Sequence, residues 1–293
     1  MKKLLAFFAL CLVMTPLALA KVPKAEKKAL LDLYESTNGD HWIKKWNLNA
    51  QVSDWYGVKV EEGHVIEINL FRNNLMGALP NSLGALKHLT KLNLAFNNIT
   101  GELPEGIVLL SNLEVLKLEM NKIKGEIPES IGAMENLQEL SLFNNFLSGN
   151  IPEGLGNISN LKILNLSSNS LSGEIPSTLG DLVQLESLGL FENDLYGFIP
   201  REMGNLVKMK ELVLANNRLT GAIPEEFGQL ASLEVFQIQN NQFNSFENLK
   251  MMDSHQFLVF DYDDDNNKND FKDINFSKTR MADTKFEDDI DND

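Results

Sequence analysis

The segment DYDDDNNKNDFKD, which begins at Asp261, has the composition of a possible calcium site. Asp261, Asp263 and Asp265 alternate there, and carboxylate oxygens are ligands that Ca²⁺ prefers. A calcium-binding helical loop needs glycine at its sixth position and glutamate at its twelfth. Counting from Asp261 gives Asn266 and Lys272 instead. The sequence leaves room for weak binding of calcium by clustered carboxylates and predicts no dedicated metal site.

No arrangement of residues typical of catalysis is present in the sequence. The histidines, His41, His64, His88 and His255, lie in different regions and follow no spacing of a metal site or a catalytic triad. The only cysteine is Cys11, and the chain has neither a G-x-S-x-G segment nor a glycine-rich phosphate loop. We therefore expect no cofactor and no enzyme activity, which leaves binding as the function.

The amino-terminal segment MKKLLAFFALCLVMTPLALA has the three parts of a signal peptide: Lys2 and Lys3, an apolar stretch, and small residues ending at Ala20. The apolar run is shorter than the roughly 20 residues of a spanning helix. A lipoprotein would need Cys11 to end this run, which continues to Val13. We expect cleavage after Ala20, and hence a secreted or periplasmic protein without a transmembrane segment or a cysteine.

The overall composition is that of a soluble globular protein, with 43% hydrophobic and 23% charged residues. The formal net charge is −15, and loss of Lys2 and Lys3 with the signal peptide makes it more negative. A surface of this sign repels phosphate backbones and anionic lipid headgroups. The charge argues against nucleic acid as a partner.

The body of the chain consists of a repeated unit with the pattern L-x-x-L-x-L-x-x-N-x-L-x-G-x-I-P-x-x-L-G-x-L-x-x, clearest in residues 161–184. The alternation L-x-L predicts a short strand whose leucines face inward. One unit cannot bury its apolar face alone, so neighbouring units stack and their strands form a parallel sheet. The eight units begin at Val65, Leu89, Leu113, Leu137, Leu161, Leu185, Met209 and Leu233.

The ninth position of the repeat is asparagine in every unit. An inward amide has both donors and an acceptor, so it can satisfy backbone groups where the chain leaves the strand. We interpret this position as structural, not as part of a ligand site. The residues are Asn73, Asn97, Asn121, Asn145, Asn169, Asn193, Asn217 and Asn241.

Glycine at the thirteenth position and proline at the sixteenth predict a turn into a short helical segment. Glycine permits positive φ or close approach of backbone, and proline presets φ for the first helical residue. Acidic residues that follow the proline, such as Glu105 and Glu129, would complement a helix N-terminus. The glycines run from Gly77 to Gly221 and the prolines from Pro80 to Pro224.

The L-x-G-x-I-P signature resembles the plant-specific class of leucine-rich repeats, which occurs in receptor-like kinase ectodomains, polygalacturonase-inhibiting proteins and exported bacterial proteins. The resemblance covers residues 65 to about 248. It implies a right-handed superhelical solenoid of the α/β type, mostly β with short helical or 3-10 turns and eight coils. It also implies a parallel concave sheet, a second short sheet beside the signature, and ligand binding on the concave or lateral face.

Both ends of the solenoid need caps, because terminal coils would otherwise expose core leucines. Residues 21–64 predict a helix from Pro23 to about Ser36, then Trp42, Trp46 and Trp55 as covering surface, and a hairpin formed by WYGVKV and VIEINL. This segment resembles the amino-terminal cap of the family but lacks its paired cysteines, which favours a bacterial member.

At the other end the repeat signature decays, with Asn248 where proline is expected. We expect coiling to stop there, and residues 249–293 to form a carboxy-terminal cap and an acidic tail. The segment from Phe257 to Phe260 is a candidate closing strand.

The candidate ligand site lies on the variable positions after each L-x-L, which alternation points onto the concave face. Apolar residues form a track there, and contiguous exposed apolar surface is typical of binding sites. The same side chains would also suit packing across adjacent coils. The track is Phe71, Phe96, Met120 and Phe143, with Phe191, Tyr196 and Phe198 as a second cluster at the lateral edge.

Polar residues beside the track are candidates for specificity, namely Arg72, Asn93, Lys117 and Glu139. Aromatic anchors within a polar rim favour a protein ligand. Aromatic faces beside amides and carboxylates also suit a glycan, and a rigid curved surface would suit an adhesin or scaffold.

Overall fold

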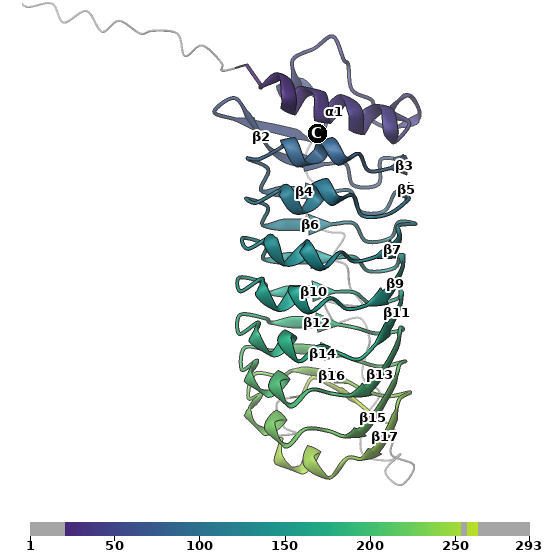
Figure 1. The fold of residues 1–293 in the computed structure, drawn as a ribbon, viewed down its shortest axis with the longest axis vertical. Helices are drawn as coiled ribbons and strands as arrows, with labels where there is room; N and C mark the ends of the chain where they lie inside the picture. Colours follow the sequence, from purple (N-terminus) through teal and green to yellow (C-terminus); the bar gives the residue numbers. More distant parts are fainter. Residues whose placement is uncertain (1–20, 253–256, 263–293) are drawn as a thin grey trace, which may run out of the picture.

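The computed structural model describes residues 21–252 and 257–262. The expected signal peptide with Cys11, the acidic tail with Asp263 and Asp265, and His255 lie outside these residues. The described chain winds into a solenoid whose coils stack along one long axis (Figure 1). Within this part of the chain, no helix has the length and apolar character needed to cross a bilayer.

The principal sheet runs along the whole stack and contains ten strands within the described residues. Its first pair is antiparallel and all later pairs are parallel, with partners such as Leu92 and Leu116 lying one repeat unit apart in the sequence. The parallel sheet expected from the repeat is therefore present. The strands, in spatial order, are β1 (Val58–Glu61), β2 (His64–Asn69), β4 (Lys91–Asn93), β6 (Val115–Lys117), β8 (Glu139–Ser141), β10 (Ile163–Asn165), β12 (Ser187–Gly189), β14 (Glu211–Val213), β16 (Val235–Gln237) and β18 (Val259–Asp261).

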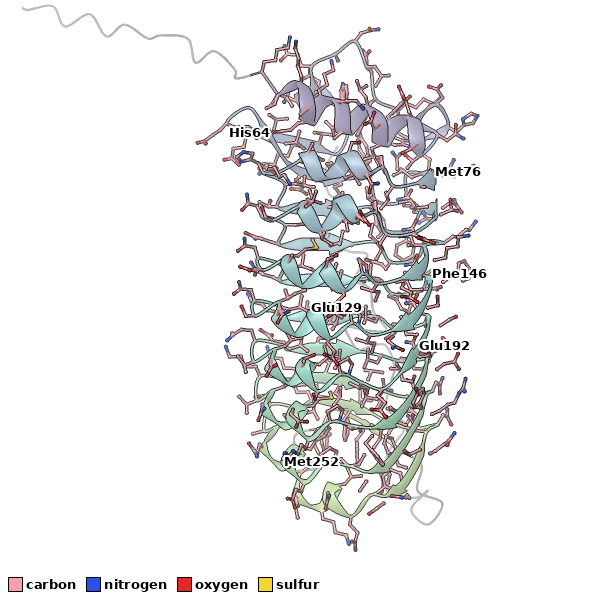
Figure 2. All side chains as sticks on the ribbon, in the orientation of Figure 1. His64, Met76, Glu129, Phe146, Glu192 and Met252 are labelled. Atoms are coloured by element: carbon pink, nitrogen blue, oxygen red, sulfur yellow. The ribbon has the colours of Figure 1, made fainter. Side chains whose placement is uncertain are left out.

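A second set of short strands lies beside the L-x-G-x-I-P segments, as the resemblance implied. One pair consists of β3 (Met76–Ala78) and β5 (Asn98–Thr100). In the part of the chain that the structure describes, the other strands form a six-stranded sheet: β7 (Lys124–Glu126), β9 (Phe146–Asn150), β11 (Ser170–Gly173), β13 (Asp194–Phe198), β15 (Arg218–Ala222) and β17 (Gln242–Ser245). Figure 2 shows Met76 and Phe146 along the edge of the molecule that carries these strands, opposite His64.

Short 3-10 turns close each coil on the side away from the principal sheet. Proline precedes the turn instead of being its first residue, as Pro104 does with φ −71° and ψ 143°. Glutamate is then the first residue of several turns, but the turns after Pro104 and Pro128 have no side-chain cap hydrogen bond. The turns are η3 (Asn81–Ala85), η4 (Glu105–Leu109), η5 (Glu129–Ala133), η6 (Glu153–Asn157), η7 (Ser177–Asp181), η8 (Arg201–Asn205), η9 (Glu225–Gln229) and η10 (Glu247–Met251).

The amino-terminal segment covers the first coil with α1 (Lys24–Ser36), followed by the short turns η1 (Gly39–His41) and η2 (Val52–Asp54). Trp42, Trp46 and Trp55 are all buried, and the rings of Trp46 and Trp55 stack with centroids 4.7 Å apart. Each indole N–H donates to a backbone carbonyl, so these side chains bury apolar surface without losing hydrogen bonds. β1 and β2 form the expected hairpin.

The carboxy-terminal end continues further than the repeat signature indicates. η10 forms where proline is missing, and the amide of Asn248 donates to the carbonyl of Ile223 at 2.7 Å. β18 pairs with β16, with Val259 opposite Val235. The candidate closing strand from Phe257 to Phe260 thus forms over Val259–Asp261, and the spacing of one repeat unit between paired residues persists beyond Asn248.

The repeat asparagines occupy the interior and join one coil to the next. The Asn121 amide donates to the carbonyls of Leu94, Leu118 and Glu119, and its oxygen accepts the Ile99 N–H at 3.0 Å. The Asn145 amide repeats this pattern one coil later. The structural interpretation of the ninth position is therefore confirmed.

Candidate functional site

The predicted apolar track lies beyond the ends of the principal strands, on the turn that leads toward the second sheet. The rings of Phe71 and Phe96 are in contact, with centroids 5.3 Å apart. The backbone N–H of Met120 donates to the carbonyl of Phe143 at 2.9 Å, which holds these two residues on adjacent coils. All four track residues are half-buried. The coils thus bring the track residues side by side, although the strands themselves end earlier.

The eighth position of the repeat, immediately before the buried asparagine, has a left-handed backbone in every described coil. Asparagine tolerates this conformation, whereas bulky side chains rarely adopt it. Three coils have asparagine at this position, but Phe96 (φ 56°) and Met120 (φ 55°) adopt the same strained backbone. The residues are Arg72, Phe96, Met120, Asn144, Ser168, Glu192, Asn216 and Asn240.

The polar candidate residues differ in how far their side chains are exposed to solvent. Arg72 is exposed, and Lys117 pairs with Glu139 across adjacent strands at 3.0 Å. Asn93 is only 3% exposed, and its side-chain oxygen accepts the N–H of Ala95. Asn93 is therefore engaged in a local turn and presents little surface to a ligand.

Glu119 lies between the track residues in the same row of turns, and sequence reasoning gave it no role. The residue is 6% exposed, and its Oε2 atom has no hydrogen-bond partner. Burial raises the pKa of this carboxyl above its ordinary value, against the opposing effects of a backbone hydrogen bond and of Lys117. A buried carboxylate oxygen of this kind would be satisfied by a donor from a ligand.

The second predicted cluster is divided between two surfaces. Phe191 packs against the cluster formed by Val213, Val235 and Val259, which belong to strands of the principal sheet. Tyr196 and Phe198 belong to β13 in the second sheet. The prediction that the three aromatic residues line one edge was therefore wrong, because the chain crosses from one sheet to the other between them.

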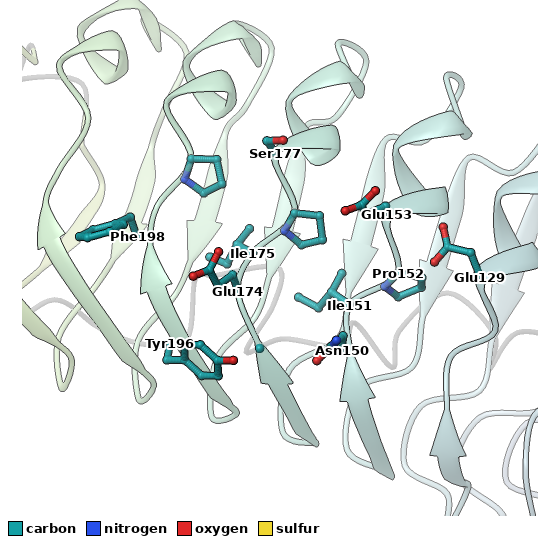
Figure 3. Close-up of a pocket in the computed structure, with 13 residues that line it drawn as sticks. Glu129, Asn150, Ile151, Pro152, Glu153, Glu174, Ile175, Ser177, Tyr196 and Phe198 are labelled. Atoms are coloured by element: carbon teal, nitrogen blue, oxygen red, sulfur yellow. The ribbon is translucent and has the colours of Figure 1, made fainter.

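Tyr196 and Phe198 instead line a groove of about 720 Å³ on the lateral face (Figure 3). Their side chains are 51% and 67% exposed. The groove extends over several coils and is bordered by the ends of β9, β11 and β13 and by the 3-10 turns. Its lining consists of Glu129, Asn150, Ile151, Pro152, Glu153, Gly173, Glu174, Ile175, Pro176, Ser177, Tyr196, Phe198 and Pro200.

The structure also brings together two histidines that we placed in different regions. The rings of His64 and His88 stack with centroids 3.8 Å apart. His64 Nδ1 lies 2.6 Å from the buried carboxylate of Glu26, which also accepts the N–H of Val65. The two histidines are one repeat unit apart in the sequence, so the repeat length itself predicts this proximity.

No group of three or more histidine, cysteine, aspartate or glutamate side chains in residues 21–252 and 257–262 is arranged to hold a metal ion. Asp261 lies in β18, but the calcium hypothesis also involves Asp263 and Asp265, which lie outside the described residues.

The sequence and the fold are similar to those of known leucine-rich-repeat proteins. A leucine-rich-repeat region model matches residues 69–171, and a single leucine-rich-repeat model matches residues 208–230. No curated protein matches the sequence. The chain has a leucine-rich-repeat solenoid fold, similar to the ectodomains of plant receptor kinases.

Among solved structures, the ectodomain of the Arabidopsis thaliana receptor kinase GASSHO1/SCHENGEN3, in complex with Casparian strip integrity factor 2, is 34% identical with a TM-score of 0.76. The match covers 80% of this chain and 29% of that one. The Arabidopsis receptor kinase HAESA, with the peptide hormone IDA and the co-receptor SERK1, is 28% identical with a TM-score of 0.62, covering 75% and 42%.

A leucine-rich-repeat protein of Leptospira interrogans is 35% identical with a TM-score of 0.53, covering 63% of this chain and 46% of that one. The present chain thus spans less than half the length of each of these three proteins.

Proposed function

We propose that this protein is an exported, non-catalytic module that binds a protein or peptide ligand through the turn surface formed by Phe71, Phe96, Met120 and Phe143. Two of the similar ectodomains were solved with peptide or protein ligands, which supports this class of function. Export rests on the expected signal peptide, which directs the module to the periplasm or outside the cell.

The observation that carries the proposal is the strained backbone at Phe96 and Met120. A non-glycine residue in the left-handed region costs on the order of 1 kcal/mol or more, and such strain is concentrated at functional sites. Other coils have asparagine at the same position, so the fold has no need of a phenylalanine or a methionine there. Binding of a ligand is a reason for keeping bulky apolar side chains at an unfavourable backbone position.

The test compares ligand capture by the full chain and by variants at the eighth position. The chain would be immobilised and crosslinked to native extracts, and the recovered proteins quantified by mass spectrometry. A true ligand should be lost with Phe96→Asn and Met120→Asn but retained with the control Ser168→Asn, which makes the same change on a coil outside the track. Equal recovery with all variants would show that the track is not the binding site.

A further inference from the structure

The lateral groove differs from the rest of the second sheet because it combines exposed aromatic rings with carboxylates. Tyr196 and Phe198 rise from β13 on one side, and Glu153 and Glu174 project from the two preceding coils (Figure 3). Contiguous exposed apolar surface beside polar groups is typical of an interaction site. Most coils have no aromatic residue at the repeat positions of Tyr196 and Phe198, so this combination is specific to one part of the solenoid.

Its shape follows from the fourteenth position of the repeat, whose side chain lies across the glycine of the next coil. A Cβ added at Gly173 would lie 2.5 Å from Asn150 Oδ1, and one at Gly197 would lie 2.9 Å from Glu174 Cγ. These glycines therefore make room for the side chains of the preceding coil. Apart from Glu174, the coil of β11 contributes only Gly173 and small or aliphatic side chains to the lining. These side chains are smaller than the rings of β13 beside them, which leaves a depression in the surface.

The charge of the groove has one sign. Glu129, Glu153 and Glu174 line it, and within the described part of the chain no lysine or arginine belongs to the lining. All three glutamates are exposed, and the Glu129 carboxylate already accepts the N–H of Gly154. A ligand that enters this groove meets two solvent-facing carboxylates beside two aromatic faces.

We propose that the groove is a second recognition site, for an extended segment of a protein partner that presents lysine or arginine side chains. The cationic groups pair with Glu153 and Glu174, while the rings of Tyr196 and Phe198 cover the aliphatic stems or face the charge. The lining comes from four successive coils, and at about 4.8 Å per coil it spans roughly 14 Å, enough for about four residues of extended chain. This site is independent of the track formed by Phe71, Phe96, Met120 and Phe143.

The experiment measures the affinity of the full chain for a short fluorescent peptide in which lysine alternates with serine. Glu153→Gln together with Glu174→Gln should weaken binding by about tenfold, because each change removes a charge-assisted contact. The matched control is Glu102→Gln with Glu105→Gln, which removes the same charges at the same two repeat positions of another coil. This control should leave the affinity unchanged within about twofold, as expected for charges outside the contact.

The aromatic contribution is tested by Tyr196→Ala with Phe198→Ala, with Phe146→Ala as the control. Phe146 is 62% exposed at the other end of β9 from Asn150 and does not line the groove. The double variant should weaken binding several-fold, because it removes the aromatic faces that contact the cationic side chains, whereas Phe146→Ala should not. Met120→Asn should leave this affinity unchanged, which separates the groove from the track.

Three results would overturn the proposal. An equal loss with the Glu102 and Glu105 control pair would mean diffuse attraction to the net charge of −15. Equal affinity for a peptide with acetylated lysines would show that no cation is recognised. Binding of neutral oligosaccharides that depends on Tyr196, without binding of the lysine peptide, would make the groove a glycan site instead.

Discussion

Two consecutive positions of each coil, the eighth and the ninth, have opposite roles although they share one turn. Asn217 is buried, donates to three carbonyls and accepts the N–H of Leu195, thereby linking two coils. Asn216, one residue earlier, has a left-handed backbone. Among the described contacts, its side-chain oxygen accepts one hydrogen bond, from the amide of Asn240. The ninth position serves the interior and the eighth is open to other uses.

The two positions show where the fold constrains the residue type and where it does not. At the ninth position the backbone groups of two coils require an amide, so asparagine recurs without exception. At the eighth, only the left-handed conformation is imposed, and the residues range from Asn216 to Phe96 and Met120. Departures from asparagine at the eighth position are therefore informative about function, and the asparagines at the ninth are not.

The sharpest test of this comparison changes the same residue type at both positions of one coil. Asn217→Ala should lower the free energy of unfolding by about 3 kcal/mol, because several backbone groups lose their partner inside the core. Asn216→Ala should cost at most about 1 kcal/mol, mainly from the left-handed backbone. Chemical denaturation of both variants measures the two values. Similar losses would contradict the division of roles.

A second prediction concerns the thirteenth position, where conformation and space both require glycine. Gly173 has φ 86°, and an added Cβ would meet Asn150 Oδ1. Gly173→Ala should therefore destabilise the protein by about 2 kcal/mol, combining backbone strain with the clash. In Asn150→Ala, which removes the clashing amide, the same change should cost only about 1 kcal/mol. Denaturation of the single and double variants gives the coupling energy between residues 150 and 173. Additive losses of stability would show that the Cβ at position 173 does not meet the Asn150 side chain.

A third prediction is a gain of stability at the eighth position. Met120→Asn places in the left-handed backbone the residue that tolerates it, so the free energy of unfolding should rise by about 0.5 to 1 kcal/mol. Ser168→Asn should give a gain of similar or smaller size. If Met120→Asn instead destabilised the protein strongly, the methionine would be a packing residue and the functional interpretation of its strain would fail.

The smallest expected effects on stability depend on pH, and they have opposite signs for Glu119 and Asp32. The pKa of Glu119 is raised above 4.5 by burial, so its ionised form opposes folding, and this penalty is absent below pH 4.5 and complete above the raised pKa. Glu119→Gln should therefore stabilise the protein at neutral pH, with the gain vanishing near pH 4. Thermal unfolding across this range measures it.

The opposite case is Asp32, whose pKa is lowered from 3.8 mainly by a hydrogen bond from Lys28. Its ionised form favours folding, and that contribution is present above pH 3.8 and lost as the pH falls through the lowered pKa. Asp32→Asn should thus destabilise slightly at neutral pH and have no effect at strongly acidic pH. Changes of the same sign for Glu119→Gln and Asp32→Asn would contradict the assigned causes.

Much of the fold could be predicted from the sequence, because the interior repeats its requirements in every unit. Period-two leucines indicated the parallel strands, and the asparagine position indicated the interior hydrogen bonds. The left-handed backbone at the eighth position was not predictable, since arginine, phenylalanine, methionine and glutamate share no preference for it. The conformation is imposed by the turn and not by the residues.

The candidate sites were predicted less well, because they depend on where the chain crosses between sheets. Phe191 and Tyr196 are close in sequence but lie on different surfaces, since the turn after β12 separates them. His64 and His88 are distant in sequence but stack, because one full coil lies between them. The groove combines residues from several coils, and no single repeat contains its pattern.

The contacts of the asparagine ladder also bear on how such a chain can change its length. The ladder bonds of Asn121 to its neighbouring coil join residues 22 and 27 apart. Duplication or loss of one whole repeat unit recreates every such bond at the new junction, wherever the event occurs within the array. The number of repeat units can therefore change without loss of stability at the new junction. A surface that spans several coils, such as the lateral groove, is preserved only if no unit is gained or lost within it.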